Sequence, residues 1–156
     1  MRRNLVLIAL SLVVFLVLNY AIYQKEQTKL HGQTVFLELA PVDPRSLMQG
    51  DFMRLSYTIE RDALKLSYRP SDPRGYLVIR PDETNVARVV RFDVGTALAE
   101  GELRLKYSRN PRGIKLVPDS FFFQEGEAKK YENAKYGVFK FDDSGTPLLV
   151  GLQDGL

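Results

Sequence analysis

A single apolar run near the amino terminus restricts this chain more than any other feature. Residues 5–22 read LVLIALSLVVFLVLNYAI, in which only Ser11, Asn19 and Tyr20 are polar. As a helix with a rise of ~1.5 Å per residue the run is about 27 Å long, close to the thickness of a bilayer's hydrocarbon core. The run is apolar on every side, which argues against a buried helix of a soluble protein. We therefore expect a transmembrane helix over residues 5–22.

The residues around the run predict its orientation. Arg2 and Arg3 stand directly before it, and basic flanks stay in the cytoplasm, so residues 1–4 should form a cytoplasmic tip and the rest should be extracytoplasmic. A cleaved signal peptide is the alternative. Its apolar core is usually about 7–15 residues long and is followed by an Ala-x-Ala site, and neither property is present here. We therefore expect an uncleaved signal anchor, followed by a polar stalk over residues 23–33.

The inventory of reactive side chains excludes most catalytic and metal-site templates. The chain has no cysteine and one histidine, His31, which lies in the stalk and is expected to be solvated. Neither a disulfide framework nor a multi-histidine metal centre can be built from these residues, and no cofactor is expected. Two of the 22 basic residues precede the run, which leaves 20 against 19 acidic residues. This balance argues against a nucleic-acid partner.

Residues 34–156 predict one extracytoplasmic domain of mainly β (α+β) class, an antiparallel sheet or partly open barrel with one short helix. A strand is expected at 34–39. Three hairpins are also expected, because in each case turn residues separate two alternating or β-branched segments. The paired segments are 76–80 and 86–93, 102–109 and 114–117, and 138–141 and 147–152. Residues 61–74 read as a loop with at most one turn of helix. Residues 124–136 contain strong helix formers between two glycines, so the short helix is expected there.

The most specific stretch is residues 41–59, PVDPRSLMQGDFMRLSYTI, where a turn rich in Pro and Gly precedes a strand. Alternation predicts that one face of this strand enters the core and that the other does not. The inner face consists of Met53, Leu55, Tyr57 and Ile59, and the outer face of Phe52, Arg54, Ser56 and Thr58. If this strand paired with the strand at 34–39, Phe52 would lie near Phe36, and Arg54 could pair with Asp43 or Glu38.

Five residues of this stretch resemble the signature Gly-Asp-Tyr-x-x-Leu-x-Tyr of the GDYXXLXY family: Gly50, Asp51, Phe52, Leu55 and Tyr57. Phe52 replaces the first Tyr of the signature, which excludes a hydroxyl role at that position. The family comprises bacterial membrane-anchored proteins of unknown function. The resemblance implies a periplasmic domain on the inner (cytoplasmic) membrane, in the company of multi-pass membrane proteins, and it supplies no catalytic residues.

Two hypotheses about function remain open. The first is a binding or accessory module for a membrane protein partner, with Phe52, Arg54 and Phe122 as interaction residues. Phe121, Phe122 and Phe123 are consecutive, so a strand should point two of them inward and one outward, and we expect at least one of Phe52 and Phe122 to be exposed.

The second hypothesis is a tethered hydrolase that uses Ser46 or the Asp43/Asp51 pair. Membrane-anchored serine proteases of the signal peptidase type place their serine about eight residues before a Gly-Asp, whereas Ser46 is four residues before Gly50. A structural role is the simpler reading of Asp51, since a turn carboxylate accepts backbone N–H bonds.

The middle of the chain is basic. Its basic residues are Arg88, Arg91, Arg104, Lys106, Arg109, Arg112 and Lys115. On amphipathic strands such residues are typical of a solvated sheet face and a protected sheet edge. An anionic lipid surface is the alternative ligand for a domain tethered to a bilayer.

Overall fold

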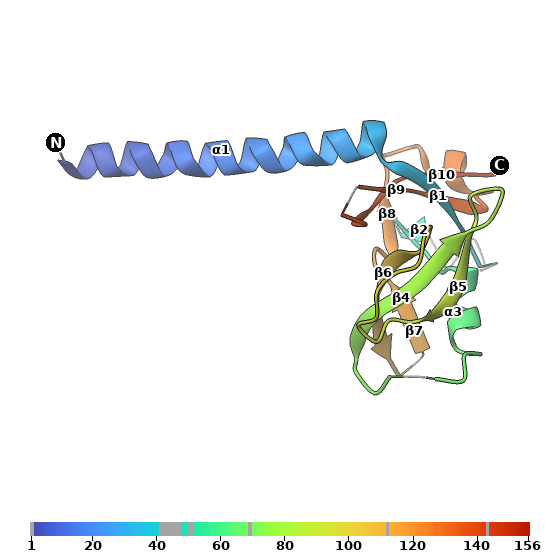
Figure 1. The fold of residues 1–156 in the computed structure, drawn as a ribbon. Helices are drawn as coiled ribbons and strands as arrows, with labels where there is room; N and C mark the ends of the chain where they lie inside the picture. Colours follow the sequence, from blue (N-terminus) through green and yellow to red (C-terminus); the bar gives the residue numbers. More distant parts are fainter. Residues whose placement is uncertain (1, 41–47, 50–51, 69, 112, 143) are drawn as a thin grey trace.

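The computed structural model describes residues 2–40, 48–49, 52–68, 70–111, 113–142 and 144–156. Helix α1 (Arg2–His31) extends from a β-rich domain as one long rod (Figure 1). Among the described residues it is the one helix long and apolar enough to cross a membrane. The helix continues to His31 through the expected stalk, so the connection to the domain is helical as far as that residue.

Ten strands and two short helices follow α1 within the described residues. The strands are β1 (Gln33–Glu38), β2 (Met48–Gln49), β3 (Phe52–Arg54), β4 (Arg74–Pro81), β5 (Ala87–Phe92), β6 (Leu103–Asn110), β7 (Gly113–Leu116), β8 (Ser120–Phe122), β9 (Tyr136–Phe141) and β10 (Pro147–Gln153). The helices are α3 (Thr58–Ala63) and α4 (Ala128–Tyr131). The predicted mainly β (α+β) class is confirmed, with α3 as an additional short helix.

The strands form three antiparallel sheets. Their orders are β1-β9-β10, β2-β3-β8 and β5-β4-β6-β7. All three expected hairpins are present, as β4–β5, β6–β7 and β9–β10. In the first sheet β9 lies between β1 and β10, so the first strand of the domain pairs with a strand from near the end of the chain.

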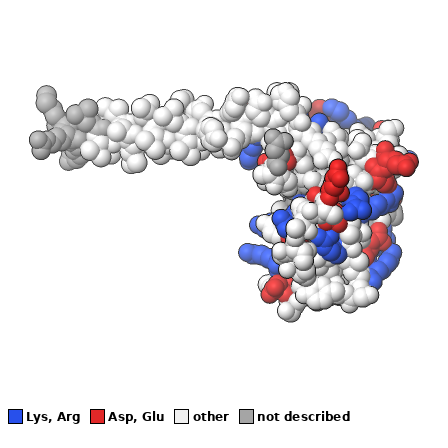
Figure 2. Space-filling view, viewed as in Figure 1, with Lys and Arg blue, Asp and Glu red and all other residues white. Residues whose placement is uncertain are grey.

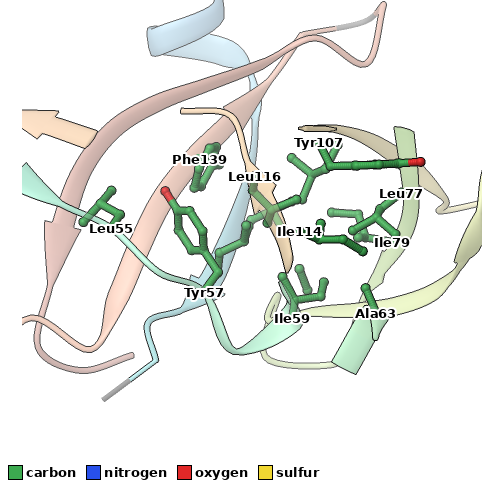
Figure 3. Close-up of a cluster of buried hydrophobic side chains, with 14 of the residues drawn as sticks. Leu55, Tyr57, Ile59, Ala63, Leu77, Ile79, Tyr107, Ile114, Leu116 and Phe139 are labelled. Atoms are coloured by element: carbon green, nitrogen blue, oxygen red, sulfur yellow. The ribbon is translucent and has the colours of Figure 1, made fainter. Parts of the chain in front are cut away.

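A single core lies between the sheets, and Figure 3 shows part of it. The inner face predicted for residues 53–59 is confirmed, since Met53, Leu55, Tyr57 and Ile59 are each at most 6% exposed. The largest fully buried side chains of the other elements include Leu37, Leu77, Tyr107 and Phe139. Each large side chain contributes about 1.5–3 kcal/mol when it is transferred from water to such a core.

The strand predicted over residues 53–59 is shorter than expected. Its ladder to β8 ends at Arg54, and residues 55–57 continue in extended form with one bridge, between Leu39 and Tyr57. Helix α3 then begins at Thr58. Alternation correctly identified the buried face because the chain stays extended as far as Tyr57. It could not indicate where the hydrogen-bonded partner strand ends.

The pairing of Phe52 with Phe36 does not occur. Strand β1 pairs with β9, Phe36 bridges Val86, and Phe52 lies opposite Phe122 of β8. Among the described ion pairs Arg54 has no contact with Glu38. The two segments flank the signature turn in sequence but belong to different sheets.

Candidate functional site

The structure describes three of the five signature residues. Phe52 is half-buried, whereas Leu55 and Tyr57 belong to the core. Gly50 and Asp51 lie outside the described residues, and so do Ser46 and Asp43. The turn role expected for Asp51 and the hydrolase residues therefore concern a part of the chain that the structure does not describe.

Tyr57 is the most deeply engaged residue of the signature. Its hydroxyl donates a hydrogen bond to the carbonyl of Pro118 at 3.0 Å, and its ring lies edge-on to Phe139 with 5.9 Å between ring centroids. Burial, reinforced by the nearby charges of Glu60 and Asp119, raises the pKa of Tyr57. The phenol therefore stays protonated and acts as a fixed donor. It ties the signature segment to the connection between β7 and β8.

A polar cluster lies directly behind the signature and consists of Ser56, Glu60 and Lys115. The Lys115 ammonium donates to Ser56 Oγ at 2.6 Å and to Glu60 Oε2 at 3.2 Å. The backbone N–H of Leu116 donates to Glu60 Oε1 at 2.9 Å. Burial raises the pKa of Glu60, although the hydrogen bonds from Leu116 and Lys115 oppose that rise.

A serine in contact with a lysine can be a catalytic pair when the lysine acts as base. Here Lys115 donates both to the hydroxyl and to a carboxylate that is 8% exposed. An ammonium held in this way fits a structural link between α3 and β7. We therefore assign the cluster to stability.

Phe122 is the most exposed aromatic side chain of the described β-rich domain, at 73%. It lies opposite Phe52 in the β3–β8 ladder, with 5.8 Å between the ring centroids. Arg54, two residues from Phe52, is also exposed. We call Phe52, Arg54 and Phe122 the aromatic surface.

The neighbours of Phe122 point the other way. Phe121 and Phe123 pack on Tyr131 of α4, with centroid distances of 5.1 and 5.7 Å. The predicted pattern of two inward rings and one outward ring is therefore confirmed. The expected exposure of at least one of Phe52 and Phe122 is also confirmed, while their role in binding stays a prediction.

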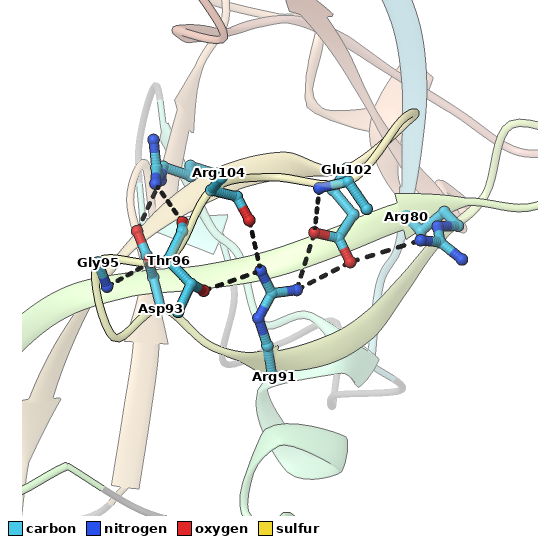
Figure 4. Close-up of polar contacts among 9 residues, drawn as sticks. Arg80, Arg91, Asp93, Gly95, Thr96, Glu102 and Arg104 are labelled. Atoms are coloured by element: carbon cyan, nitrogen blue, oxygen red, sulfur yellow. Dashed lines mark hydrogen bonds and ion pairs between the residues drawn. The ribbon is translucent and has the colours of Figure 1, made fainter.

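Much of the basic charge in the middle of the chain is paired across strands. Arg91 Nη1 donates to both carboxylate oxygens of Glu102 at 2.8 Å, and Arg80 lies 3.4 Å from the same carboxylate (Figure 4). Arg104 Nε lies 2.6 Å from Asp93 Oδ2. The hydrogen bond from Arg91 is the main reason that the pKa of Glu102 is lowered.

The same contacts hold the loop between β5 and β6. The backbone N–H of Ala99 donates to Glu102, and the guanidinium of Arg91 reaches the Thr96 hydroxyl and the Ala97 carbonyl. Burial raises the pKa of Asp93, but hydrogen bonds from Arg104 and the Gly95 N–H outweigh burial and lower it overall. These pairs fit the interpretation of a solvated and self-compensated sheet face.

A groove of about 550 Å³ lies between the outer face of β4 and β6 and the turn that joins β9 to β10. Its lining includes Tyr76, Arg104, Lys106, Val117, Thr146 and Pro147. We call it the basic groove. Within the described residues no group of three or more His, Asp or Glu side chains could hold a metal ion.

Comparison with known proteins identifies the family. A family model described as GDYXXLXY protein matches residues 14–152, nearly the whole chain. The chain belongs to the GDYXXLXY family. No curated protein and no solved structure matched it. In this GDYXXLXY protein the Leu and second Tyr of the signature, Leu55 and Tyr57, are core residues, and the first aromatic position, Phe52, lies on the aromatic surface.

Two features of this GDYXXLXY protein were not predicted from its sequence. The contact of Glu60 with Lys115 joins residues far apart in the chain, and no local pattern indicates it. The basic groove likewise combines residues of β4, β6 and the β9–β10 turn. The one signal available was Glu60 itself, which follows the core residue Ile59 and begins a charged stretch. His31 ends α1 and is exposed, as expected for a solvated side chain.

Proposed function

We propose that this GDYXXLXY protein is a single-pass membrane protein whose extracytoplasmic domain binds a membrane protein partner through the aromatic surface. In this proposal α1 is an uncleaved signal anchor in the bacterial inner membrane, with its amino terminus in the cytoplasm and the domain in the periplasm. Arg2 and Arg3 before the apolar run support this orientation.

The anchor is supported by side chains that have nothing to pack against in the described part of the chain. Phe15, Leu16 and Val17 on α1 are each about 60% exposed, and α1 is uncharged along most of the face seen in Figure 2. Exposure of so much apolar surface to water is unfavourable. A lipid bilayer covers the surface of such a helix on every side.

The observation that carries the binding proposal is the exposure of Phe122, 73%, next to two rings that the domain itself covers. Burial of an aromatic ring of this size is a large source of binding energy, and aromatic anchors with a neighbouring Arg are typical of interface centres. Phe52 supports the exposed ring from one side and Arg54 adds a charged rim. A domain held at one bilayer surface meets other membrane proteins more often than soluble ones, which favours a membrane protein as the partner.

Site-specific photo-crosslinking in intact cells tests this proposal. Phe122→p-benzoylphenylalanine keeps an aromatic ring at the position and should give a discrete adduct with a protein that stays in the membrane fraction. Tyr68 is 59% exposed and lies outside the aromatic surface, so the same substitution at Tyr68 is the matched control. Arg54→Glu should weaken the Phe122 adduct. Adducts of equal yield at both positions, or none at Phe122, would contradict the proposal.

No contact among the described residues supports the hydrolase alternative. Ser46, Asp43 and Asp51 lie outside the described residues, and the described serine that contacts a lysine, Ser56, belongs to the structural cluster with Glu60.

A further inference from the structure

The basic groove combines an apolar wall with a cation that has no ion-pair partner among the described residues. Tyr76 and Val117 line it and are 47% and 44% exposed. Lys106 stands on β6 between the buried residues Leu105 and Tyr107 and is itself exposed. Among the described residues Lys106 has no carboxylate within ion-pair distance.

The described carboxylates at the groove are already engaged. Asp93, which lines the groove, is paired with Arg104 at 2.6 Å. Asp142, at the start of the β9–β10 turn, accepts hydrogen bonds from the N–H groups of Ser144 and Thr146 and from the Ser144 hydroxyl. Among the described residues the charge of Lys106 is therefore uncompensated, and the groove offers an anion a cation beside apolar and aromatic surface.

The groove is also on the side of the domain that faces the bilayer. Strand β9 runs antiparallel to β1, so its last residue, Phe141, lies opposite Gln33, directly after the end of α1. The turn beyond Phe141 therefore extends back along α1, and Figure 1 shows it (red) on the side toward which α1 extends. Figure 2 shows Lys and Arg side chains on the same side of the domain.

The distances place the rim of the basic groove close to the lipid headgroups. Residues 23–31 add about 14 Å of helix beyond the apolar run at ~1.5 Å per residue. The headgroup layer occupies about 5–7 Å of that distance. The β9–β10 turn starts level with Gln33, two residues beyond the end of α1, and reaches back by roughly two residues, so its tip lies about level with the end of α1. The rim of the basic groove then lies within about 10 Å of the headgroup layer.

We propose that the basic groove binds the phosphodiester headgroup of an anionic lipid in the bilayer that holds α1, with Lys106 on the phosphate and Tyr76 and Val117 against the glycerol backbone. The inference rests on the membrane anchoring proposed above. It extends that proposal because it gives the domain a second contact with the membrane, which would hold the aromatic surface at a fixed height and direction.

The test uses the full chain in nanodiscs of phosphatidylcholine and phosphatidylglycerol in a 3:1 ratio, with matched acyl chains. Tyr76→p-azidophenylalanine retains the aromatic ring at the groove and reports the bound lipid as a mass increment after illumination. We expect phosphatidylglycerol adducts well above the one-quarter share set by the composition. Lys106→Gln should lower the ratio of phosphatidylglycerol to phosphatidylcholine adducts about fivefold, the effect of one surface cation on an anionic headgroup.

Three controls separate lipid binding in the groove from other causes of lipid enrichment. Lys129 on α4 is exposed and does not line the groove, so Lys129→Gln should leave the adducts unchanged. The same azide at Tyr68 should give no enrichment. Raising NaCl to 0.5 M should reduce the enrichment at Tyr76, because salt screens an exposed charge.

The outcomes divide clearly. Adducts in proportion to lipid composition, adducts unaffected by Lys106→Gln, or no lipid adduct at Tyr76 would each overturn the proposal. If inorganic phosphate at the same concentration as the lipid abolished the lipid adducts at Tyr76, the bound anion would be free phosphate and not a lipid headgroup. Loss of the chain from the discs in size-exclusion chromatography would instead show that α1 does not anchor it, and so would refute the membrane proposal itself.

Discussion

Lys115 of β7 and Glu60 of α3 join two elements that are 55 residues apart in the chain, through a contact of 3.2 Å at the edge of the core. Glu60 is 8% exposed, Lys115 is 33% exposed, and the Leu116 N–H completes the shell of the carboxylate. The carboxylate has exchanged water for one cation and one backbone donor. Removal of either donor should therefore have a measurable cost.

Lys115→Met should destabilise the domain by about 1–2 kcal/mol, because it leaves the Glu60 carboxylate buried without its cation. This cost is lower than that of breaking a fully buried ion pair, because Lys115 retains contact with water. Glu60→Gln keeps an acceptor for Leu116 and removes the charge, so it should cost less. Urea unfolding of the full chain in mild detergent, followed by circular dichroism, measures both. Lys129→Met is the control and should stay within about 0.5 kcal/mol of the parent. A Lys115→Met variant as stable as the parent would show that water replaces the pair.

Asp82 should make the domain sensitive to acid. Hydrogen bonds to its carboxylate lower the pKa of Asp82 from 3.8 to about 2. The main donor is the Thr84 hydroxyl, and the N–H groups of Val86 and Thr84 and the Arg88 guanidinium also donate. A lowered pKa in the folded state contributes stability that is present above pH 3.8 and is lost as the pH falls through about 2.

Asp82→Asn should therefore be less stable than the parent at pH 7, and the two proteins should converge near pH 2. Melting temperatures across this range give the measurement. Glu60 works in the opposite sense, since its raised pKa favours the folded state at low pH and this contribution is lost as the pH rises through the folded-state pKa. A constant difference between Asp82→Asn and the parent from pH 7 to 2 would contradict the assignment.

Topology can be measured directly because the chain contains no cysteine. A single cysteine in place of Ser71, which is exposed in the loop before β4 and does not line the basic groove, should react with a membrane-impermeant maleimide in intact spheroplasts. A cysteine in place of Asn4, before the apolar run, should react only after lysis. The reverse pattern would invert the proposed orientation, and reaction at both sites in sealed cells would argue against a spanning helix.

The two aromatic positions of the signature should differ in their tolerance. Tyr57→Phe removes the hydrogen bond to Pro118 O and leaves a carbonyl without its donor, at a cost of about 1–2 kcal/mol. Phe52→Tyr restores the family's residue on a half-buried surface position, and its hydroxyl can reach water, so it should change stability by less than about 0.5 kcal/mol. Thermal melts distinguish the two. A large loss with Phe52→Tyr would mean that the ring is more enclosed than the aromatic surface implies.

The features predicted correctly are those in which neighbouring residues carry the signal. The buried set Met53, Leu55, Tyr57 and Ile59 follows from alternation alone, because an extended chain presents every second residue to one side whether or not it is paired. The outward direction of Phe122 follows from the same rule. Hairpins joined by short turns are local as well, which explains why all three were expected.

The features that were missed depend on contacts distant in sequence. The partner of Phe52 is Phe122 and not Phe36, since β3 and β1 join different sheets, and the intervening turn does not determine that choice. The basic groove was missed for the same reason. Lys106 belongs to an ordinary alternating strand, and the groove forms only because the β9–β10 turn, distant in sequence, lies beside that strand. The candidate site was therefore predictable at the aromatic surface and not at the groove.

The central place of β9 in the sheet β1-β9-β10 sets an order on the protein's biogenesis. Strand β1 follows α1 directly, yet Phe141, the residue opposite Gln33, comes 108 residues later. The ribosome must deliver these residues before β1 can pair with β9. Val35 and Leu37, which are buried in the finished domain, stay uncovered until then. In the proposed topology, a chain interrupted before β9 would be tethered at the membrane with an open strand edge beside it, a state prone to aggregation and open to proteases.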